Sequence, residues 1–108
     1  MVRQLHVKEL AARLRAGAPV YLLDVRQPWE HELAALPGSH LLPLDQLPAR
    51  AGEVRPAEGV PVVVYCHHGI RSLTGAALLE RRGLPDVASL AGGIDAWSLL
   101  VDPGVPRY

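Results

Sequence analysis

The sequence has 108 residues, balances 11 acidic against 11 basic side chains, and is 49% hydrophobic, which suits one domain with its own core. It lacks the basic excess of a nucleic-acid-binding domain, and its single cysteine excludes an internal disulfide and suits a reducing compartment. No apolar run approaches the roughly 20 residues that span a bilayer, and residues 1–6 lack the apolar segment of a secretory leader. We therefore expect one soluble, cytoplasmic domain, residues 1–108, that binds neither nucleic acid nor membrane.

Short apolar segments alternate with helical patterns along the chain. In chain order, the pattern predicts a helix at 7–16, a buried strand at 20–24, a short helix at 29–35, a brief strand at 39–42, a weak helical turn at 45–51, a strand at 62–65, a helix at 71–82, a strand at 87–90 and a helix at 94–100. Gly83 lies where a helix C-cap belongs. The tail, residues 101–108, contains two prolines and is expected to pack irregularly.

This alternation of strands and helices predicts a parallel sheet with helices on both faces. Ligands of such sheets bind at the carboxyl ends of the strands. Cys66 directly follows residues 62–65, the strongest strand pattern in the chain, so its thiol is expected at such an end.

The segment after Cys66 favours the ionised form of the thiol. It is a short loop that leads into the predicted helix, so successive backbone N–H groups can converge on one point and form an anion-binding nest. The helix N-terminus adds the positive end of its dipole, and Arg71, His67 and His68 add cationic side chains. Each of these favours the thiolate, which is the nucleophilic form of cysteine.

Two further residues of the loop have expected structural roles. Gly69 can adopt the positive φ that turns the backbone N–H groups inward, and Ser72 is placed to satisfy the first turn of the following helix. A lone cysteine is more often a small buried hydrophobic residue than a nucleophile. Because a merely structural cysteine has no need of a cationic loop, we interpret Cys66 as reactive.

Three segments of the chain resemble the rhodanese-like family of single-domain sulfurtransferases. Asp24-Val25-Arg26, followed by Glu30 and Pro37-Gly38-Ser39-His40, is similar to the first motif of the family, and the segment from Tyr65 to Ser72 is similar to its active-site loop. The C-terminal motif is matched by Gly83, residues 87–90 and Gly92-Gly93-Ile94-Asp95-Ala96-Trp97. The resemblance implies a doubly wound α/β fold, a parallel sheet of about five strands with helices on both faces.

The resemblance also implies an enzyme, a thiosulfate or persulfide sulfurtransferase. Cys66 would take the outer sulfur of a small donor such as thiosulfate, or of a protein persulfide, and pass it to a thiol or to cyanide. The family's binding loop corresponds to His67, His68, Gly69, Ile70, Arg71 and Ser72, and the N–H groups from His67 to Arg71 would stabilise the terminal sulfur of a Cys66 persulfide. No cofactor is expected, and no metal site, because Cys66, His67 and His68 are too nearly adjacent to bind one tetrahedral ion.

Several alternatives stay open at this point. A non-catalytic, partner-binding rhodanese-like module is disfavoured because such modules usually lack the cysteine. A phosphatase or arsenate reductase on the same fold is disfavoured because those loops are one residue longer, whereas four residues separate Cys66 from Arg71. Arg71 either binds an anionic donor or braces the loop against a carboxylate, and at least one of His67 and His68 is expected to be a bystander.

Two expectations concern residues outside the loop. Asp24 and Arg26 are interpreted as a supporting structural ion pair beside the site. The tail, residues 101–108, resembles the endings of rhodanese domains fused to sulfur-activating enzymes, which hints at a biosynthetic partner.

Overall fold

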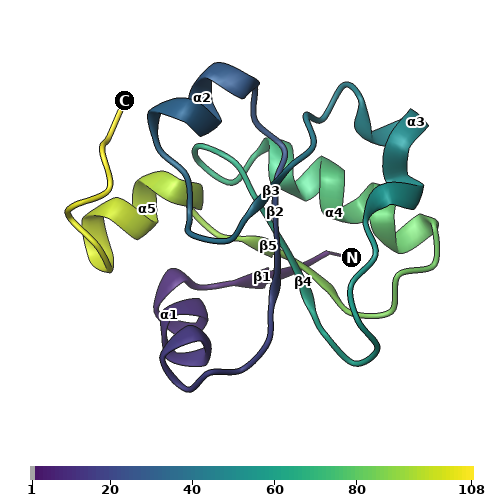
Figure 1. The fold of residues 1–108 in the computed structure, drawn as a ribbon, viewed down its shortest axis with the longest axis horizontal. Helices are drawn as coiled ribbons and strands as arrows, with labels where there is room; N and C mark the ends of the chain where they lie inside the picture. The colour runs from purple at the N-terminus through teal and green to yellow at the C-terminus, as the bar shows by residue number, and fades with distance from the viewer. Residues whose placement is uncertain (1) are drawn as a thin grey trace.

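The computed structural model describes residues 2–108 and contains one parallel sheet with helices on both faces (Figure 1). The strands are β1 (Arg3–Leu5), β2 (Tyr21–Asp24), β3 (His40–Leu41), β4 (Val62–Tyr65) and β5 (Val87–Leu90), in the order β1-β5-β4-β2-β3. The helices are α1 (Val7–Arg15), α2 (Pro28–Leu33), α3 (Leu47–Arg50), α4 (Arg71–Arg81) and α5 (Gly93–Leu100), with a 3-10 turn at Ala51–Glu53. The predicted fold class is confirmed.

Side chains of the central strand β4 alternate between two apolar cores. Val63 and Tyr65 pack into the core under α1 and α5, and Val62 and Val64 pack into the core under α3 and α4. Figure 1 shows these helix pairs on opposite sides of the sheet. All four residues of β4 are buried, because a strand covered on both faces has no solvent side. This explains the unbroken apolar run of residues 62–65.

The predicted elements agree with the structure apart from their ends and one strand. The strands at 62–65 and 87–90 have the predicted bounds, and the weak helical turn at 45–51 consists of the short helix α3 and the 3-10 turn that follows it. Strand β1 was not predicted. It lies at the edge of the sheet and buries only Leu5, so its three residues show no apolar pattern, and its conformation follows from pairing with β5.

Strands β2 and β4 are neighbours in the sheet, with Asp24 opposite Tyr65. Because the strands are parallel, the residues that follow them meet at one edge. Cys66 and Arg26 therefore lie at the same end of the sheet. None of the helices in residues 2–108 is long and apolar enough to cross a membrane.

Candidate active site

The sulfur of Cys66 lies at the end of β4, within the loop that leads to α4. Its Sγ accepts the backbone N–H of Gly69 at 3.1 Å and that of Ser72 at 3.3 Å, and the thiol donates to Ser72 Oγ at 3.4 Å. Two amides at the start of a helix thus converge on one sulfur and favour negative charge there. Only 1% of Cys66 is exposed, so the sulfur lies inside the loop and not on its outer surface.

Ser72 contacts the sulfur instead of capping the helix. The N-cap of α4 is Ile70, which makes no side-chain cap and whose side chain is 73% exposed at the rim of the loop. Ser72 Oγ lies 2.7 Å from Ser89 Oγ on β5. The predicted capping role of Ser72 is therefore wrong, because its hydroxyl lies on the buried face of α4, where Ser89 and the Cys66 thiol are its partners.

The N-terminus of α5 orients the first peptides of the loop. Ile94 N–H donates to the Cys66 carbonyl at 2.9 Å, and Asp95 N–H donates to the His67 carbonyl at 3.1 Å. Gly93 has φ +61°, and a Cβ there would overlap both of these carbonyl oxygens. The Gly-Gly segment therefore allows the close backbone approach that turns the carbonyls at the start of the loop toward α5.

Gly69 completes the contact between the loop and this turn. Its φ is +93°, and a Cβ would lie 2.9 Å from the backbone N of Gly92. A side chain at this position would be strained by its φ and would press on the backbone of the turn before α5. The positive φ predicted for Gly69 is thus observed, and its N–H donates to Sγ.

Arg71 is braced against a carboxylate. Its Nη1 and Nη2 donate to Oε1 and Oε2 of Glu30 at 2.7 and 2.9 Å. The hydrogen bonds from Arg71 are the main reason that the pKa of Glu30 falls to about 2, and the same contact raises the pKa of Arg71. Of the two roles left open for Arg71, the structure shows this bidentate ion pair.

Asp24 and Arg26 form a second, fully buried ion pair beside the loop. Arg26 Nε and Nη2 donate to Oδ1 and Oδ2 of Asp24 at 2.8 and 2.7 Å. Arg26 Nη2 also donates to the carbonyl of Ala34 just after α2, and His31 Nδ1 lies 2.8 Å from Asp24 Oδ2. The pair thus fixes α2, which carries Glu30, against the sheet.

The two loop histidines differ in environment. Burial, and next the neighbouring charge of His68, lower the pKa of His67, which disfavours the positive charge predicted for this side chain. The side chain of His68 is exposed, and its Nδ1 lies 3.8 Å from Asp95. In the part of the chain that the structure describes, no three His, Cys, Asp or Glu side chains are grouped to hold a metal ion.

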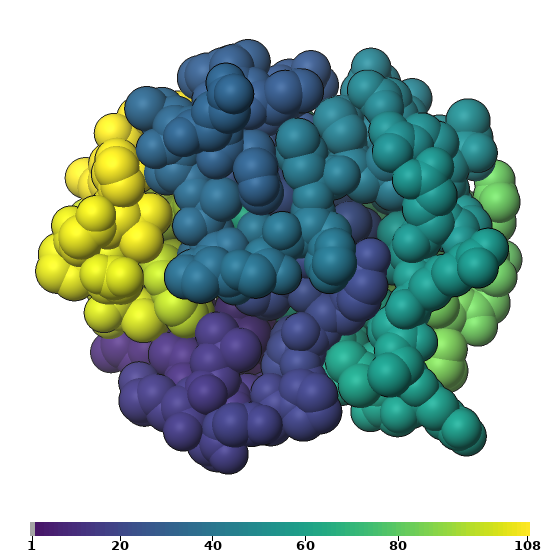
Figure 2. All heavy atoms as spheres, in the orientation of Figure 1, coloured from purple at the N-terminus to yellow at the C-terminus, as the bar shows by residue number. Residues whose placement is uncertain are grey.

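Tyr108 is a member of the site that the sequence analysis missed. Its hydroxyl accepts from Arg26 Nη1 at 2.8 Å and donates to Glu30 Oε2 at 2.7 Å, and its ring stacks on His67 with centroids 3.9 Å apart. Figure 2 shows the C-terminal segment lying against the segment that contains α2. No local pattern marks such a residue; only the resemblance of the tail to the endings of fused rhodanese domains drew attention to it.

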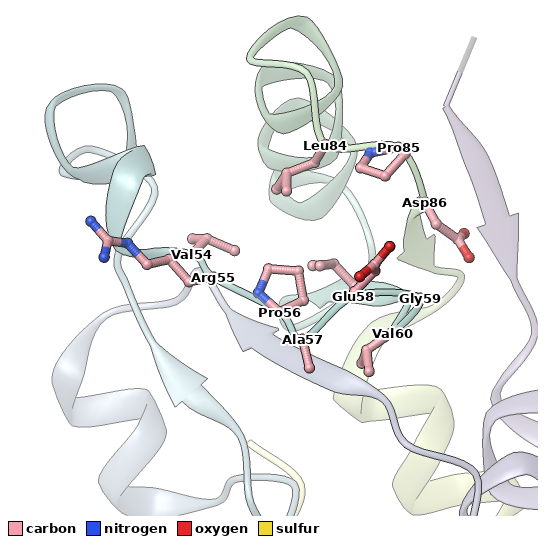
Figure 3. A pocket seen from close by; sticks show the side chains of 11 residues that line it. Val54, Arg55, Pro56, Ala57, Glu58, Gly59, Val60, Leu84, Pro85 and Asp86 are labelled. Atoms are coloured by element: carbon pink, nitrogen blue, oxygen red, sulfur yellow. The ribbon is translucent and has the colours of Figure 1, made fainter.

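A separate pocket of about 600 Å³ lies at the opposite end of the sheet, before β4 and β5 (Figure 3). Its lining is mainly apolar and includes Val54, Val62 and Leu84, with charged side chains such as Glu58 and Asp86 among them. No thiol, hydroxyl or imidazole lines this pocket. Its only potential nucleophiles among the described residues are carboxylates, whereas the Cys66 loop holds a thiol under two backbone N–H donors.

Comparison with known proteins identifies the protein family that this chain resembles in sequence and structure. The family model of the rhodanese-like domain matches residues 6–100. A sulfurtransferase of Allochromatium vinosum is 35% identical over 98 residues, which are 91% of this chain and 90% of that protein. The solved structure of a thiosulfate sulfurtransferase from Pseudomonas aeruginosa has a TM-score of 0.82 at 30% identity and covers 98% of this chain and 20% of that chain.

Other relatives are much longer than this chain. The probable adenylyltransferase/sulfurtransferase MoeZ of Mycobacterium tuberculosis is 31% identical over 101 residues, which are 94% of this chain but 26% of that protein. Further curated relatives are matched over 38% and 20% of their own length. The matched regions cover 99%, 94% and 85% of this chain in these three relatives.

Proposed function

The chain belongs to the rhodanese-like domain family, and on that premise we propose that it is a sulfurtransferase that carries a sulfane sulfur as a persulfide on Cys66. One observation carries the proposal: the N–H groups of Gly69 and Ser72 both donate to Cys66 Sγ at the start of a helix. Such donors stabilise an anionic sulfur, which both the resting thiolate and the persulfide require.

The first step is a displacement at sulfur. The Cys66 thiolate attacks the outer sulfur of the donor, a new S–S bond forms, and the bond between that sulfur and the rest of the donor breaks. With thiosulfate, sulfite leaves with the electron pair of the broken bond; with a persulfide, a thiolate leaves. Cys66 then carries one additional sulfur, whose negative charge lies within reach of the loop amides.

The second step returns the enzyme to its starting state. A thiolate or cyanide attacks the outer sulfur, the S–S bond to Cys66 breaks, and Cys66 recovers the electron pair as a thiolate. Cyanide becomes thiocyanate, and a thiol becomes a persulfide. Both steps are nucleophilic displacements whose atoms and electrons balance between donor, Cys66 and acceptor, so the proposal includes no cofactor.

Thiocyanate formation from thiosulfate and cyanide tests this proposal, with a small organic persulfide as a second donor. We expect the unaltered chain to form product and Cys66→Ser to form none, since a serine hydroxyl does not accept sulfane sulfur. Ser98→Ala is a matched control, because Ser98 is a small, buried polar residue whose hydroxyl, among the described residues, donates only to Ile94 O of its own helix.

Other outcomes separate the rival functions. Hydrolysis of an aryl phosphate, lost in Cys66→Ser, would favour a phosphatase. Inactivity with every donor and with the aryl phosphate, in a chain shown to be folded by circular dichroism, would favour a partner-binding module and contradict the proposal.

A further inference from the structure

We propose that Tyr108 is a positioning residue for sulfur transfer, whose hydroxyl joins the two ion pairs beside the Cys66 loop and whose ring fixes the side chain that follows Cys66. The inference rests on the proposed function and assigns a role to a tail residue that lies 42 positions after Cys66 in the sequence.

The hydroxyl of Tyr108 connects the two ion pairs. It accepts from Arg26, the partner of Asp24, and donates to Glu30, the partner of Arg71. Burial raises the pKa of Tyr108 to about 12, so the hydroxyl keeps the proton that it donates. Through the Tyr108 hydroxyl, the buried Arg26 side chain therefore helps to hold the Glu30–Arg71 pair in place at the start of α4.

The ring of Tyr108 fixes His67. The two rings are nearly parallel, 6° apart, and their centroids are 3.9 Å apart, while the rings of Trp29 and Tyr108 form a T-shaped pair with centroids 5.8 Å apart. His67 Nε2 is buried and makes no hydrogen bond among the described residues. The position of this imidazole therefore depends on its contacts with Tyr108, through stacking and a backbone hydrogen bond, and on the neighbouring His68 ring.

These contacts reach both ends of the loop that surrounds the sulfur. His67 directly follows Cys66, and Arg71 directly precedes Ser72, whose N–H donates to Sγ. The tail itself is well anchored, because Val101 and Val105 pack against the core and Arg107 pairs with Asp95 at 2.8 Å. These contacts hold the tail in place, so that Tyr108 can stabilise the conformation of the loop.

The chain offers a matched control for the test. Tyr21 also stacks on a histidine, His40, with centroids 4.4 Å apart and an 11° interplanar angle, but these residues belong to β2 and β3, away from the loop. Tyr21→Leu and Tyr108→Leu each remove one tyrosine–histidine stack. Tyr108→Phe keeps the stack and removes only the hydroxyl bridge.

We expect kcat/KM for thiosulfate or a persulfide to fall about tenfold in Tyr108→Leu and about threefold in Tyr108→Phe, and to change less than about twofold in Tyr21→Leu, because small displacements of a catalytic loop are costly. Assays run at a temperature where circular dichroism shows all variants folded. Proton NMR titration gives a second readout: the pKa of His67 rises in Tyr108→Leu, because less of the imidazole is buried and burial is the main cause that lowers this pKa, and it is unchanged in Tyr108→Phe and Tyr21→Leu.

Equal kcat/KM in Tyr108→Leu and Tyr21→Leu overturns the inference and leaves the proposed function intact. If Tyr108→Leu does not fold, Tyr108→Phe decides: an unchanged kcat/KM overturns the hydroxyl bridge. An unaltered chain that is inactive with every donor overturns the proposed function, and this inference with it.

Discussion

At the scale of single residues, backbone amides rather than free cations surround the Cys66 sulfur. The three arginines near the loop, Arg26, Arg71 and Arg107, are each paired with a carboxylate, on Asp24, Glu30 and Asp95 respectively. Each pair offsets part of its arginine's charge, although Arg71 still interacts electrostatically with Cys66, and the groups that donate directly to the sulfur are the N–H groups of Gly69 and Ser72. The sequence displays the cationic residues but not their partners.

The Glu30–Arg71 pair predicts a pH dependence of stability. The folded pKa of Glu30, about 2, lies below its ordinary value of 4.5, so the pair stabilises the folded state fully above about pH 4.5 and loses this contribution as the pH falls toward 2. Glu30→Gln should lower the free energy of unfolding by about 1.5 to 3 kcal/mol at neutral pH, and by progressively less as the pH falls from about 4.5 toward 2.

Urea denaturation at a series of pH values measures this difference. Glu58→Gln is the control, because it removes an exposed carboxylate at the opposite end of the sheet. A stability difference for Glu30→Gln that stays constant from neutral pH to about pH 3 would contradict the assigned coupling.

The residues of the site differ in how well a short segment of the sequence predicts them. Cys66 and Gly69 were identified from one short segment, because a strand, a cysteine, a glycine and a helix start follow each other directly. Tyr108 was not, because its partners Arg26 and Glu30 are 82 and 78 positions away. Side-chain contacts at such separations depend on how the elements pack, which no periodicity encodes.

At the scale of elements, α5 determines the conformation of the loop before α4. Its first N–H groups donate to the carbonyls of Cys66 and His67, which orients the first peptide planes of the loop, while Gly69 and Ser72 supply the N–H groups that reach the sulfur. The C-terminal motif of the sequence therefore acts on the cysteine loop through backbone hydrogen bonds. The sequence motif alone does not reveal this role, because the hydrogen bonds join residues about 28 positions apart in the chain.

Gly93→Ala tests this coupling. Its φ of +61° and the overlap of a Cβ with the two loop carbonyls predict a loss of at least about 2 kcal/mol of stability and a fall in kcat/KM of more than about tenfold. Gly52→Ala is the control, since no atom lies within 4 Å of a Cβ there and its φ is not positive. Thermal unfolding and the thiocyanate assay measure both effects, and an active, equally stable Gly93→Ala would refute the role assigned to α5.

The strands and helices themselves were predictable to different degrees. Strand β4 was found at its observed bounds because burial on both faces leaves an uninterrupted β-branched run. Strand β1 was missed because two of its three side chains are exposed and only Leu5 faces the core. Edge strands owe their conformation to the neighbour with which they pair, and that information lies outside the segment.

At the scale of the whole molecule, the parallel sheet brings Cys66 and the two ion pairs together at the carboxyl ends of its strands. β2 and β4 are neighbours, although 37 residues separate the end of one from the start of the other. The alternation of elements predicted the class of fold, but the order β1-β5-β4-β2-β3 does not follow from alternation alone. Because of that order, the segments that carry Glu30 and Arg71 lie side by side, and the C-terminal tail lies against α2.

Intact-mass spectrometry after treatment with thiosulfate or an organic persulfide shows whether Cys66 carries sulfur. We expect that the unaltered chain gains the mass of one sulfur atom, that peptide mapping locates it on Cys66, and that a reducing thiol removes it. Cys66→Ser should gain nothing under the same treatment. An unchanged mass in the folded, unaltered chain, or a gain that persists in Cys66→Ser, would contradict the account.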